Sequence, residues 1–358
     1  MKQSAYALAT LAALSLNHAA WAQSSVQLYG LLDAGVEVVN HAGEGSGQGS
    51  LVRVVSGGKN TSRWGIRGSE DLGGGLKAVF NLEGAILMDN GGTDGPLFKR
   101  QAYVGLDGAF GRVIVGRSFT TTYDLVIKFD PLGFAPNYSW ATSGGATGPS
   151  KYGMTTAFDN LVKYTGKSSG RTGEFTYGAS VGLGERAGGS ANGRKYALGG
   201  SWFGDGFGVM AAYEAVNGTA VAAGERDRTA AYHLAADYRR GDWRYTAGTR
   251  GYKLQAATPA TADLRGDTYW GGITRVIDKV TLTGALYHIN TRNLPAARDA
   301  DPTMLVARAM LALSKRTDLY LSVAHARADH GQPVGLSRDD AGAAPTQSGI
   351  TAGIQHRF

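Results

Sequence analysis

The end of the chain alternates strictly between apolar and polar positions. In residues 348–358 one parity carries Ile350, Ala352, Ile354, His356 and Phe358, and the other carries Thr351, Gly353, Gln355 and Arg357. Because successive side chains of a strand point to opposite faces, this pattern predicts a strand with one largely apolar face. A soluble edge strand needs protection from stray pairing, whereas a closed barrel in a bilayer has no edge and turns its apolar face to lipid. The ending therefore favours a membrane-spanning β-barrel.

Alternating segments of this kind recur along the whole chain. Sixteen of them are separated by turn signals, at residues 25–40, 62–69, 76–89, 97–107, 112–119, 160–167, 174–183, 195–203, 206–216, 228–239, 243–254, 268–277, 279–290, 303–314, 318–328 and 348–358. An even number allows an antiparallel meander to close with both chain ends on the periplasmic side. The pattern predicts an all-β fold, a 16-stranded antiparallel transmembrane β-barrel.

The connections between these segments fall into two classes. Short turns at 72–75, 108–111, 204–205 and 240–242 alternate with long polar connections at 41–61, 185–194, 217–227, 256–266, 291–302 and 329–346. Short periplasmic turns and longer outer loops are typical of bacterial barrels. The connections thus support the barrel and indicate which of its ends faces the periplasm.

One segment separates a water-filled barrel from a soluble β-sandwich or propeller. In residues 243–250 one face carries Trp243, Tyr245, Ala247 and Thr249, and the other carries Arg244, Thr246, Gly248 and Arg250. A soluble core would not tolerate arginines at that parity without partners, because burying an unpaired charge is costly. A watery lumen accepts them, which leaves the soluble fold as the weaker alternative.

Residues 1–22 have the pattern of a secretory signal peptide. Lys2 supplies the positive start, residues 5–16 form a short apolar stretch, and Ala20-Trp21-Ala22 provides the small-x-small cleavage pattern. An N-terminal membrane anchor is the alternative, but the apolar stretch is shorter than the roughly 20 residues that a spanning helix needs. We expect an exported chain whose mature barrel domain is residues 23–358.

The composition narrows the class further. An exported chain with Cys 0 cannot be held by disulfides, so its stability must come from a large folded unit. The hydrophobic share of 43% argues against disorder, although Gly 54 is high. The net charge of +7 is spread along the chain, and no nucleic-acid-binding signature is present. We therefore expect no nucleic-acid partner.

The stretch 120–159 is too long for a hairpin turn, and loops of this length are usually functional or disordered. Its aromatic residues allow it to pack, so we interpret it as a constriction loop folded into the lumen of a barrel too wide to be filled by side chains. The candidate constriction residues are Asp124 and Asp130 on the loop and Arg63, Arg67, Arg100, Arg117 and Lys163 on the strands around it. Opposed acidic and basic rows create a transverse field that biases ion passage. Solvated lumen charges without a special role are the alternative for any single residue.

Strand parity decides which of these side chains face inward. Arg63 and Arg67 share a face, with Trp64 and Ile66 on the other. In residues 99–106, Arg100 shares its parity with small or apolar residues, and the rival parity would turn Lys99 and Gln101 inward instead. The sequence leaves both parities open in this segment.

Several motifs together resemble the Gram-negative general porins of the betaproteobacterial type. The residues that carry the resemblance are Ser62-Arg63-Trp64-Gly65-Ile66-Arg67-Gly68-Ser69-Glu70-Asp71-Leu72-Gly73-Gly74-Gly75-Leu76-Lys77-Ala78-Val79-Phe80, Arg100-Gln101-Ala102-Tyr103-Val104-Gly105-Leu106, 111–118, Asp159-Asn160-Leu161-Val162-Lys163-Tyr164 and the start Val26-Gln27-Leu28-Tyr29-Gly30. The resemblance covers essentially the whole mature chain.

The resemblance implies a homotrimer in the outer membrane, in contact with lipid and lipopolysaccharide, that passes small hydrophilic solutes and ions. It also implies that Arg63 and Arg100 lie on the basic side of the pore, that Asp130 lies on the inward third loop, and that Phe358 is the signal read by the barrel-assembly machinery. One departure is Ala157, where the family often has a basic residue, which leaves the strength of anion preference open.

Other function classes find less support. No His-x-x-x-His pair is present, and His233 and Asp237, four residues apart on one strand, would be about 13 Å apart. We expect no enzyme, no metal and no cofactor. A substrate-specific channel is the more serious alternative, since Tyr123, Tyr138 or Trp140 offers rings on which a sugar stacks. The sequence favours a general-diffusion porin with weak anion selectivity.

Overall fold

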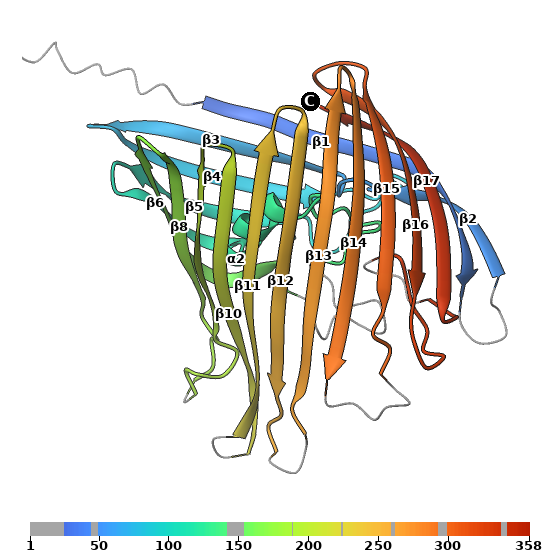
Figure 1. Ribbon diagram of the computed structural model, residues 1–358. Coiled ribbons are helices and arrows are strands. Elements are labelled where there is room, and N and C mark those ends of the chain that lie inside the picture. The colour runs from blue at the N-terminus through green and yellow to red at the C-terminus, as the bar shows by residue number, and fades with distance from the viewer. Residues whose placement is uncertain are drawn as a thin grey trace, which may run out of the picture.

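The wall of the molecule is one curved antiparallel β-sheet (Figure 1). A computed structural model describes residues 25–43, 49–141, 154–187, 189–222, 225–258, 262–292, 299–337 and 342–358. The predicted signal peptide, residues 1–22, lies outside the described residues. None of the described helices is long and apolar enough to cross a membrane.

The strands of the first half run from the N-terminus to the middle of the wall. They are β1 (Ser25–Ala42), β2 (Gly49–Ser56), β3 (Arg63–Gly73), β4 (Leu76–Ala85), β5 (Gln101–Gly108), β6 (Gly111–Phe119), β7 (Ala157–Gly170), β8 (Gly173–Gly182) and β9 (Lys195–Gly204). Between β6 and β7 lie a helix, α2 (Thr121–Val126), and a 3-10 turn, η2 (Ile127–Phe129).

The second half is a continuous meander. Its strands are β10 (Phe207–Ala222), β11 (Glu225–Arg240), β12 (Trp243–Gln255), β13 (Leu264–Ile277), β14 (Val280–Arg292), β15 (Thr303–Ala312), β16 (Thr317–Arg327) and β17 (Thr346–Arg357). The short turns and the C-terminus lie at the upper end of Figure 1, and the long connections lie at the lower end.

The first and last strands close the barrel. β1 pairs antiparallel with β17, with Val36 opposite Ala352, and the backbone N–H of Phe358 donates to the carbonyl of Gly30 at 3.1 Å. β2 and β3 pair with successive stretches of β1, so together they count as one strand of the wall. The predicted closed barrel of 16 antiparallel strands is confirmed.

The predicted long polar connection at residues 41–61 is wrong, because a strand lies within it. β1 continues to Ala42, β2 returns along it, and the chain leaves the wall only at residues 57–62. The alternation was present in β2, where Val52 and Val54 are exposed outward and Arg53 forms an ion pair with Glu37 of β1 at 2.6 Å. The many glycines and polar residues around it concealed that short period.

The two faces of the wall differ as the alternation predicts. On β1, Val36 and Val38 are exposed outward, whereas Asp33 and Glu37 are 0% and 1% exposed on the inner face. On β17 the outward positions 350, 352 and 354 alternate with the buried Thr351. The inner face of the barrel is therefore polar, and the apolar band looks toward the membrane.

The hairpin between β3 and β4 depends on glycine. Gly73, Gly74 and Gly75 all have positive φ, at 88°, 61° and 80°. Residues with a Cβ rarely adopt such angles in succession, so this short turn requires the glycine run.

Candidate functional site

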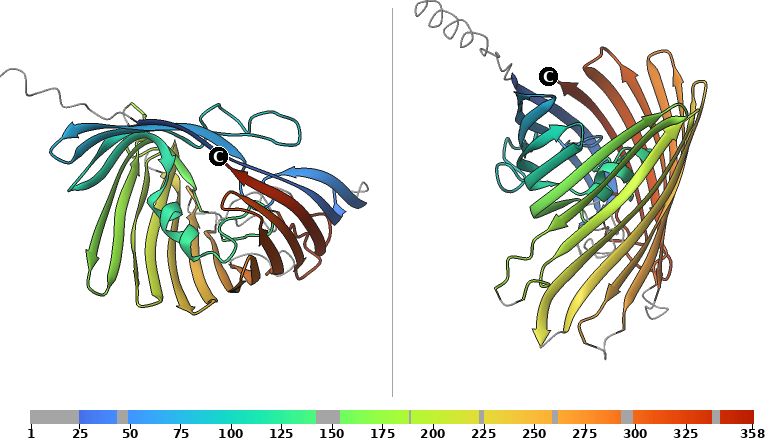
Figure 2. Two further views of the ribbon diagram at one scale, coloured as in Figure 1. Left: turned by 90° about the horizontal axis from the view of Figure 1, so that it is seen from above. Right: turned by 90° about the vertical axis from the view of Figure 1, so that its left-hand side faces the viewer.

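The described parts of the stretch between β6 and β7 form a folded segment along the inner face of the wall. Thr120 caps α2 by accepting a hydrogen bond from the backbone N–H of Tyr123 at 3.0 Å. The stretch then turns through η2 and continues to residue 141 without further regular structure. Seen from above, α2 lies within the curve of the sheet (Figure 2).

Aromatic side chains of this segment are fully buried against the wall. Phe129, Tyr138 and Trp140 are 0% exposed. The Phe129 ring stacks on Phe203 of β9 at 5.0 Å between centroids, and the indole N–H of Trp270 on β13 donates to the Phe129 carbonyl at 2.9 Å. Burial of such rings dominates packing energy, so the segment is attached to the wall at both β9 and β13.

Asp130 is the polar centre of this packing. Its carboxylate is buried and accepts hydrogen bonds from the backbone N–H of Phe134 at 2.6 Å, the Ser139 hydroxyl at 2.8 Å and the Tyr287 hydroxyl of β14 at 2.5 Å. Arg308 of β15 donates to the neighbouring Leu132 carbonyl at 3.4 Å. Asp130 thus organises the turn of the segment and ties it to the wall.

Two further wall residues hold the flanks of the same segment. Arg250 of β12 is fully buried and donates to the Ala141 carbonyl at 2.8 Å. Glu214 of β10 accepts a hydrogen bond from the Thr155 backbone N–H at 3.1 Å. The side chain of His233 on β11 lies between them, with Nε2 at 3.9 Å from Glu214. Ala141 is therefore attached to β12 and Thr155 to β10, so the described residues on both sides of positions 142–153 are held by this part of the wall.

Tyr138 connects the segment to the first strand. Its hydroxyl donates to Glu37 of β1 at 3.1 Å and contacts the Thr351 hydroxyl at 2.8 Å. Burial, together with the negative charge of Glu37, raises the pKa of Tyr138 well above its ordinary value. The phenol therefore stays a hydrogen-bond donor across the physiological range.

Two arginines share one carboxylate on the facing wall. Glu83 of β4 is 4% exposed and lies 2.7 Å from Nε of Arg100 and 3.8 Å from Nε of Arg63. The Tyr29 hydroxyl donates to the same carboxylate at 2.8 Å, and the Arg100 guanidinium lies 5.0 Å from the centre of the Phe119 ring. The side chains of Arg63 and Arg100 keep 28% and 15% of their surface exposed, so this cluster presents net positive charge to the lumen.

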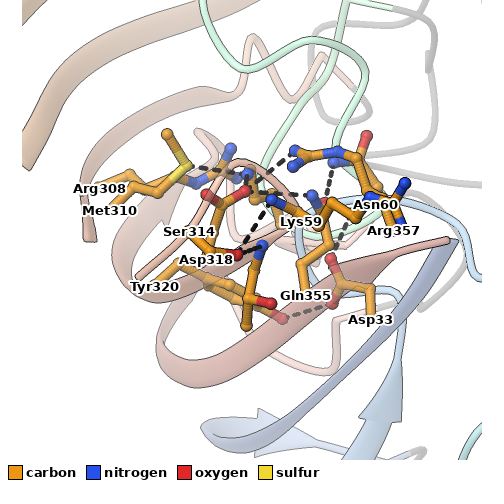
Figure 3. Close-up of polar contacts among 12 residues, drawn as sticks. Asp33, Lys59, Asn60, Arg308, Met310, Ser314, Asp318, Tyr320, Gln355 and Arg357 are labelled. Carbon is orange, nitrogen blue, oxygen red and sulfur yellow. Dashed lines mark hydrogen bonds and ion pairs between the residues drawn. The ribbon is translucent and has the colours of Figure 1, made fainter. Parts of the chain in front are cut away.

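The excursion at residues 57–62 places another basic group inside the barrel (Figure 3). Lys59 lies 3.2 Å from Asp318 of β16, and the backbone N–H of Asn60 donates to Asp33 at 2.9 Å. Arg357 of β17 pairs with the same Asp318 at 3.0 Å. The Asn137 N–H in turn donates to the Gly58 carbonyl at 3.3 Å, which joins this excursion to the folded segment.

A cavity of about 720 Å³ lies beside the folded segment, and its lining includes Arg239 and Arg244, which flank the short turn between β11 and β12. Its lining includes six basic and two acidic residues, Lys59, Lys128, Arg239, Arg244, Arg308 and Arg357 against Asp130 and Glu174. Burial, assisted by the charge of Lys167, lowers the pKa of Lys128 in the segment below its ordinary value. The lumen is therefore basic on this side as well.

Residues 7–331 match the family of Gram-negative porins. The chain belongs to this family. It is 32% identical over 387 residues to outer membrane porin protein 32 of Delftia acidovorans, with 100% of both chains covered. It is also 36% identical over 177 residues to an outer membrane porin protein of Bordetella pertussis, a match that covers 46% of this chain and 44% of that one.

Solved structures agree with this membership. The porin is similar to the anion-selective porin from Comamonas acidovorans, with a TM-score of 0.78, 27% identity, and coverage of 94% of this chain and 100% of that one. OmpT of Vibrio cholerae in its trimer form matches with a TM-score of 0.68 and 16% identity, over 94% of this chain and 99% of that one. At that identity the second likeness shows the fold alone.

The structure sorts the predicted site residues of the porin into separate groups. Arg63 and Arg100 meet around Glu83, while Lys163 pairs with Asp124 and donates to the Phe119 carbonyl at 3.0 Å. Asp130 lies apart from both groups, beside Tyr287. The sequence predicted opposed rows of acidic and basic side chains. In the structure most of these charges are instead paired with a neighbouring side chain.

Arg67 and Arg117 are not brought into either group. Arg67 lies 4.8 Å from the centre of the Tyr29 ring and donates to Gln27 at 2.8 Å. Arg117 shares the outward parity of the exposed Val115 and contacts Asp159. A place for Arg117 in the constriction stays a prediction without a supporting contact.

Neither of the two predicted parities holds throughout residues 99–106. Within β5 the rival parity holds, since Val104 is 62% exposed outward and Gln101 contacts the buried Ser118 at 3.3 Å on the inner face. Arg100 precedes the strand, and its backbone N–H donates to the Glu83 carbonyl at 3.2 Å. Arg100 therefore reaches the lumen from the connection before β5, where the alternation of a strand does not apply.

Sequence reasoning missed Glu83 and misplaced the aromatic rings. Glu83 shares its parity with Asn81 on β4, which was the available signal for an inward polar row. The rings of Tyr138 and Trp140 are fully buried, so they offer no surface on which a sugar could stack. Among the described residues no group of three or more acidic or histidine side chains is arranged to hold a metal ion.

Proposed function

We propose that this outer-membrane porin forms a water-filled channel for small hydrophilic solutes and ions that passes anions more readily than cations. The observation that carries the anion preference is the pair Arg63 and Arg100 around the single carboxylate of Glu83. Two guanidinium groups and one carboxylate leave a net positive charge at a half-buried place, where a charge acts more strongly than in bulk water. The related porin from Comamonas acidovorans is itself described as anion-selective.

The proposal assigns the constriction to the folded stretch 120–159. Support comes from the buried contacts of Phe129, Asp130 and Tyr138 with strands on several sides of the wall. A 16-stranded barrel without such a segment would leave a wide aqueous channel. Restricting the passage brings ions close to the arginine pair, and selectivity requires that closeness.

The oligomer and the assembly partners are part of the same proposal. The solved OmpT structure is described as a trimer, and we infer a homotrimer here, seated among outer-membrane lipid and lipopolysaccharide. Phe358, whose backbone pairs with Gly30, would serve the barrel-assembly machinery as the terminal signal. The named relatives are porins, and we propose a passive channel without catalysis.

A reversal-potential measurement tests the anion preference. The purified porin in a planar bilayer, with a KCl gradient across it, is expected to show a potential displaced toward the chloride equilibrium value. The displacement should shrink as the salt concentration rises on both sides, because ions screen exposed charges over about 10 Å at 0.1 M. A potassium-preferring channel would contradict the anion preference and leave the pore itself standing.

Removing the carboxylate between the arginines should strengthen the preference. In Glu83→Gln the hydrogen bond from Tyr29 keeps an acceptor, but the cluster gains one unit of positive charge. We expect the reversal potential to move further toward chloride by a measurable step. The matched control is Asp94→Asn, which changes the net charge equally but lies at an exposed ion pair with Lys99 in an outer connection. Equal potentials for both variants would mean that total charge, not the cluster, sets selectivity.

A further inference from the structure

The outward surface of the wall has a groove across β13 to β16 with a volume of about 550 Å³. Its lining is mainly apolar and includes Ile273, Leu282, Gly284, Ala307, Ala309 and Leu321. This volume falls in the range of roughly 300–1,000 Å³ that is usual for sites that hold a small molecule. The groove opens on the outward face, and at its floor lie Thr283 and Arg308, which also line the cavity beside the folded segment.

The strand register explains why the surface is hollow there. Gly284 lies opposite Ala307, and the larger Ile273 and Val323 stand on either side of this pair. In the neighbouring row Ala309 lies between Leu282 and Leu321 in the same way. A Cβ added at Gly284 would meet no atom within 4 Å, so the groove is open at this point. Small residues flanked by branched ones thus form an apolar channel along the wall.

A cation stands at one end of the groove. Arg275 follows Ile273 on the outward face of β13, close to the short turn that begins after Ile277, and it lies opposite Leu282. Its guanidinium carbon is 4.9 Å from the centre of the Trp243 ring. Among the ion pairs of the described residues none involves Arg275, and its hydrogen-bond donors remain available. Short turns mark the periplasmic side, so this end lies at the inner leaflet.

We propose that the groove binds one phospholipid of the inner leaflet, with an acyl chain along the apolar channel and the phosphate on Arg275. The planar guanidinium matches a phosphate geometrically, and its hydrogen bonds to an anion are stronger than neutral ones. The Trp243 ring lies against the guanidinium and stabilises its positive charge. Aromatic side chains are also enriched at this depth of a membrane protein.

The charge also favours a phospholipid over a second copy of the chain. A flat apolar contact with another barrel would bury Arg275 without an anion, and an unpaired buried charge is costly. A phospholipid supplies both the anion and the apolar chain. An acyl chain that enters the groove leaves the apolar tails of the bilayer for a similarly apolar surface, so this transfer contributes little free energy. The phosphate contact and the fit in the groove must therefore supply the preference for this site.

Native mass spectrometry of the detergent-purified porin, titrated with phosphatidylglycerol, tests this site. The wild-type porin should retain one lipid per chain. Arg275→Gln should weaken retention about tenfold through loss of the charge-assisted contact. Gly284→Phe should abolish retention by filling the groove, and Ala307→Leu provides a second filling variant if the first fails to assemble.

Two controls address charge and bulk separately. Lys279→Gln removes a neighbouring charge from the turn, and Ala211→Phe adds the same bulk to an exposed position of β10 outside the groove. Both should retain lipid as the wild type does, and channel conductance should stay unchanged in every variant. Equal retention in Gly284→Phe and Ala211→Phe would overturn the proposal. A filling variant that changes the oligomeric state while lipid retention persists would assign the groove to a second copy and overturn it as well.

Discussion

The double variant Arg63→Ala with Arg100→Ala is expected to shift the reversal potential of the porin toward potassium. Both guanidinium groups surround Glu83, which stays in place and becomes the dominant charge of the cluster. At an effective dielectric constant of about 20, a unit charge about 8 Å from a passing ion contributes roughly 2 kcal/mol. Screening reduces this figure at high salt. We therefore expect a severalfold change in the chloride-to-potassium permeability ratio, large enough to reverse it.

The control for this variant removes the same charge elsewhere. Lys99 pairs with Asp94 in an exposed connection, and Arg117 lies on the outward face with Asp159, so Lys99→Ala with Arg117→Ala spares the lumen cluster. Its reversal potential should stay near that of the wild type. A shift of the control as large as that of the test variant would place the selectivity outside the arginine pair.

Asp130→Ala is expected to release the folded segment and to raise single-channel conductance. The substitution leaves three buried donors, from Phe134, Ser139 and Tyr287, without their acceptor. Each unsatisfied buried group costs about 1–3 kcal/mol, which is a large share of the energy that holds a single loop. Planar-bilayer recordings should show larger and noisier current steps, and the barrel should persist because its backbone ladder is untouched.

Tyr287→Phe is the graded comparison for this experiment. It removes one of the three hydrogen bonds and preserves the packing of the ring, so its conductance should lie between wild type and Asp130→Ala. Wild-type conductance in Asp130→Ala would mean that other contacts, such as those of Arg250 with Ala141, suffice to hold the segment.

The architecture was within reach of the sequence because a strand has a period of two. Where one face of a strand meets lipid, every second residue is apolar, as Val36 and Val38 are, and this alternation predicts the strand. The break between β2 and β3 was beyond reach, because the glycine-rich polar residues 57–62 have the composition of an ordinary connection between two separate strands of the wall. Only the pairing of both strands with β1 reveals that they form one strand of the barrel.

The site was less accessible for a different reason. Its members meet through register and tertiary packing, which local patterns do not encode. Glu83 comes between Arg63 and Arg100 only through the pairing of β3, β4 and the residue before β5. Arg117 misled because apolar residues occupy both parities of β6, with Val115 exposed and Ile114 buried. The partner of Asp130, Tyr287, is distant in sequence and belongs to the far wall.

The pairing of β1 with β17 has a consequence for how the molecule is made. The contact between Gly30 and Phe358 joins strands that lie far apart in the sequence, so the ring is completed only when β17 meets β1. Until then both end strands expose unpaired backbone groups, which neither lipid nor another strand should be allowed to reach. Contacts this distant in sequence also form slowly. An unclosed sheet therefore presents two open edges, and the pairing of β17 with β1 removes both at once.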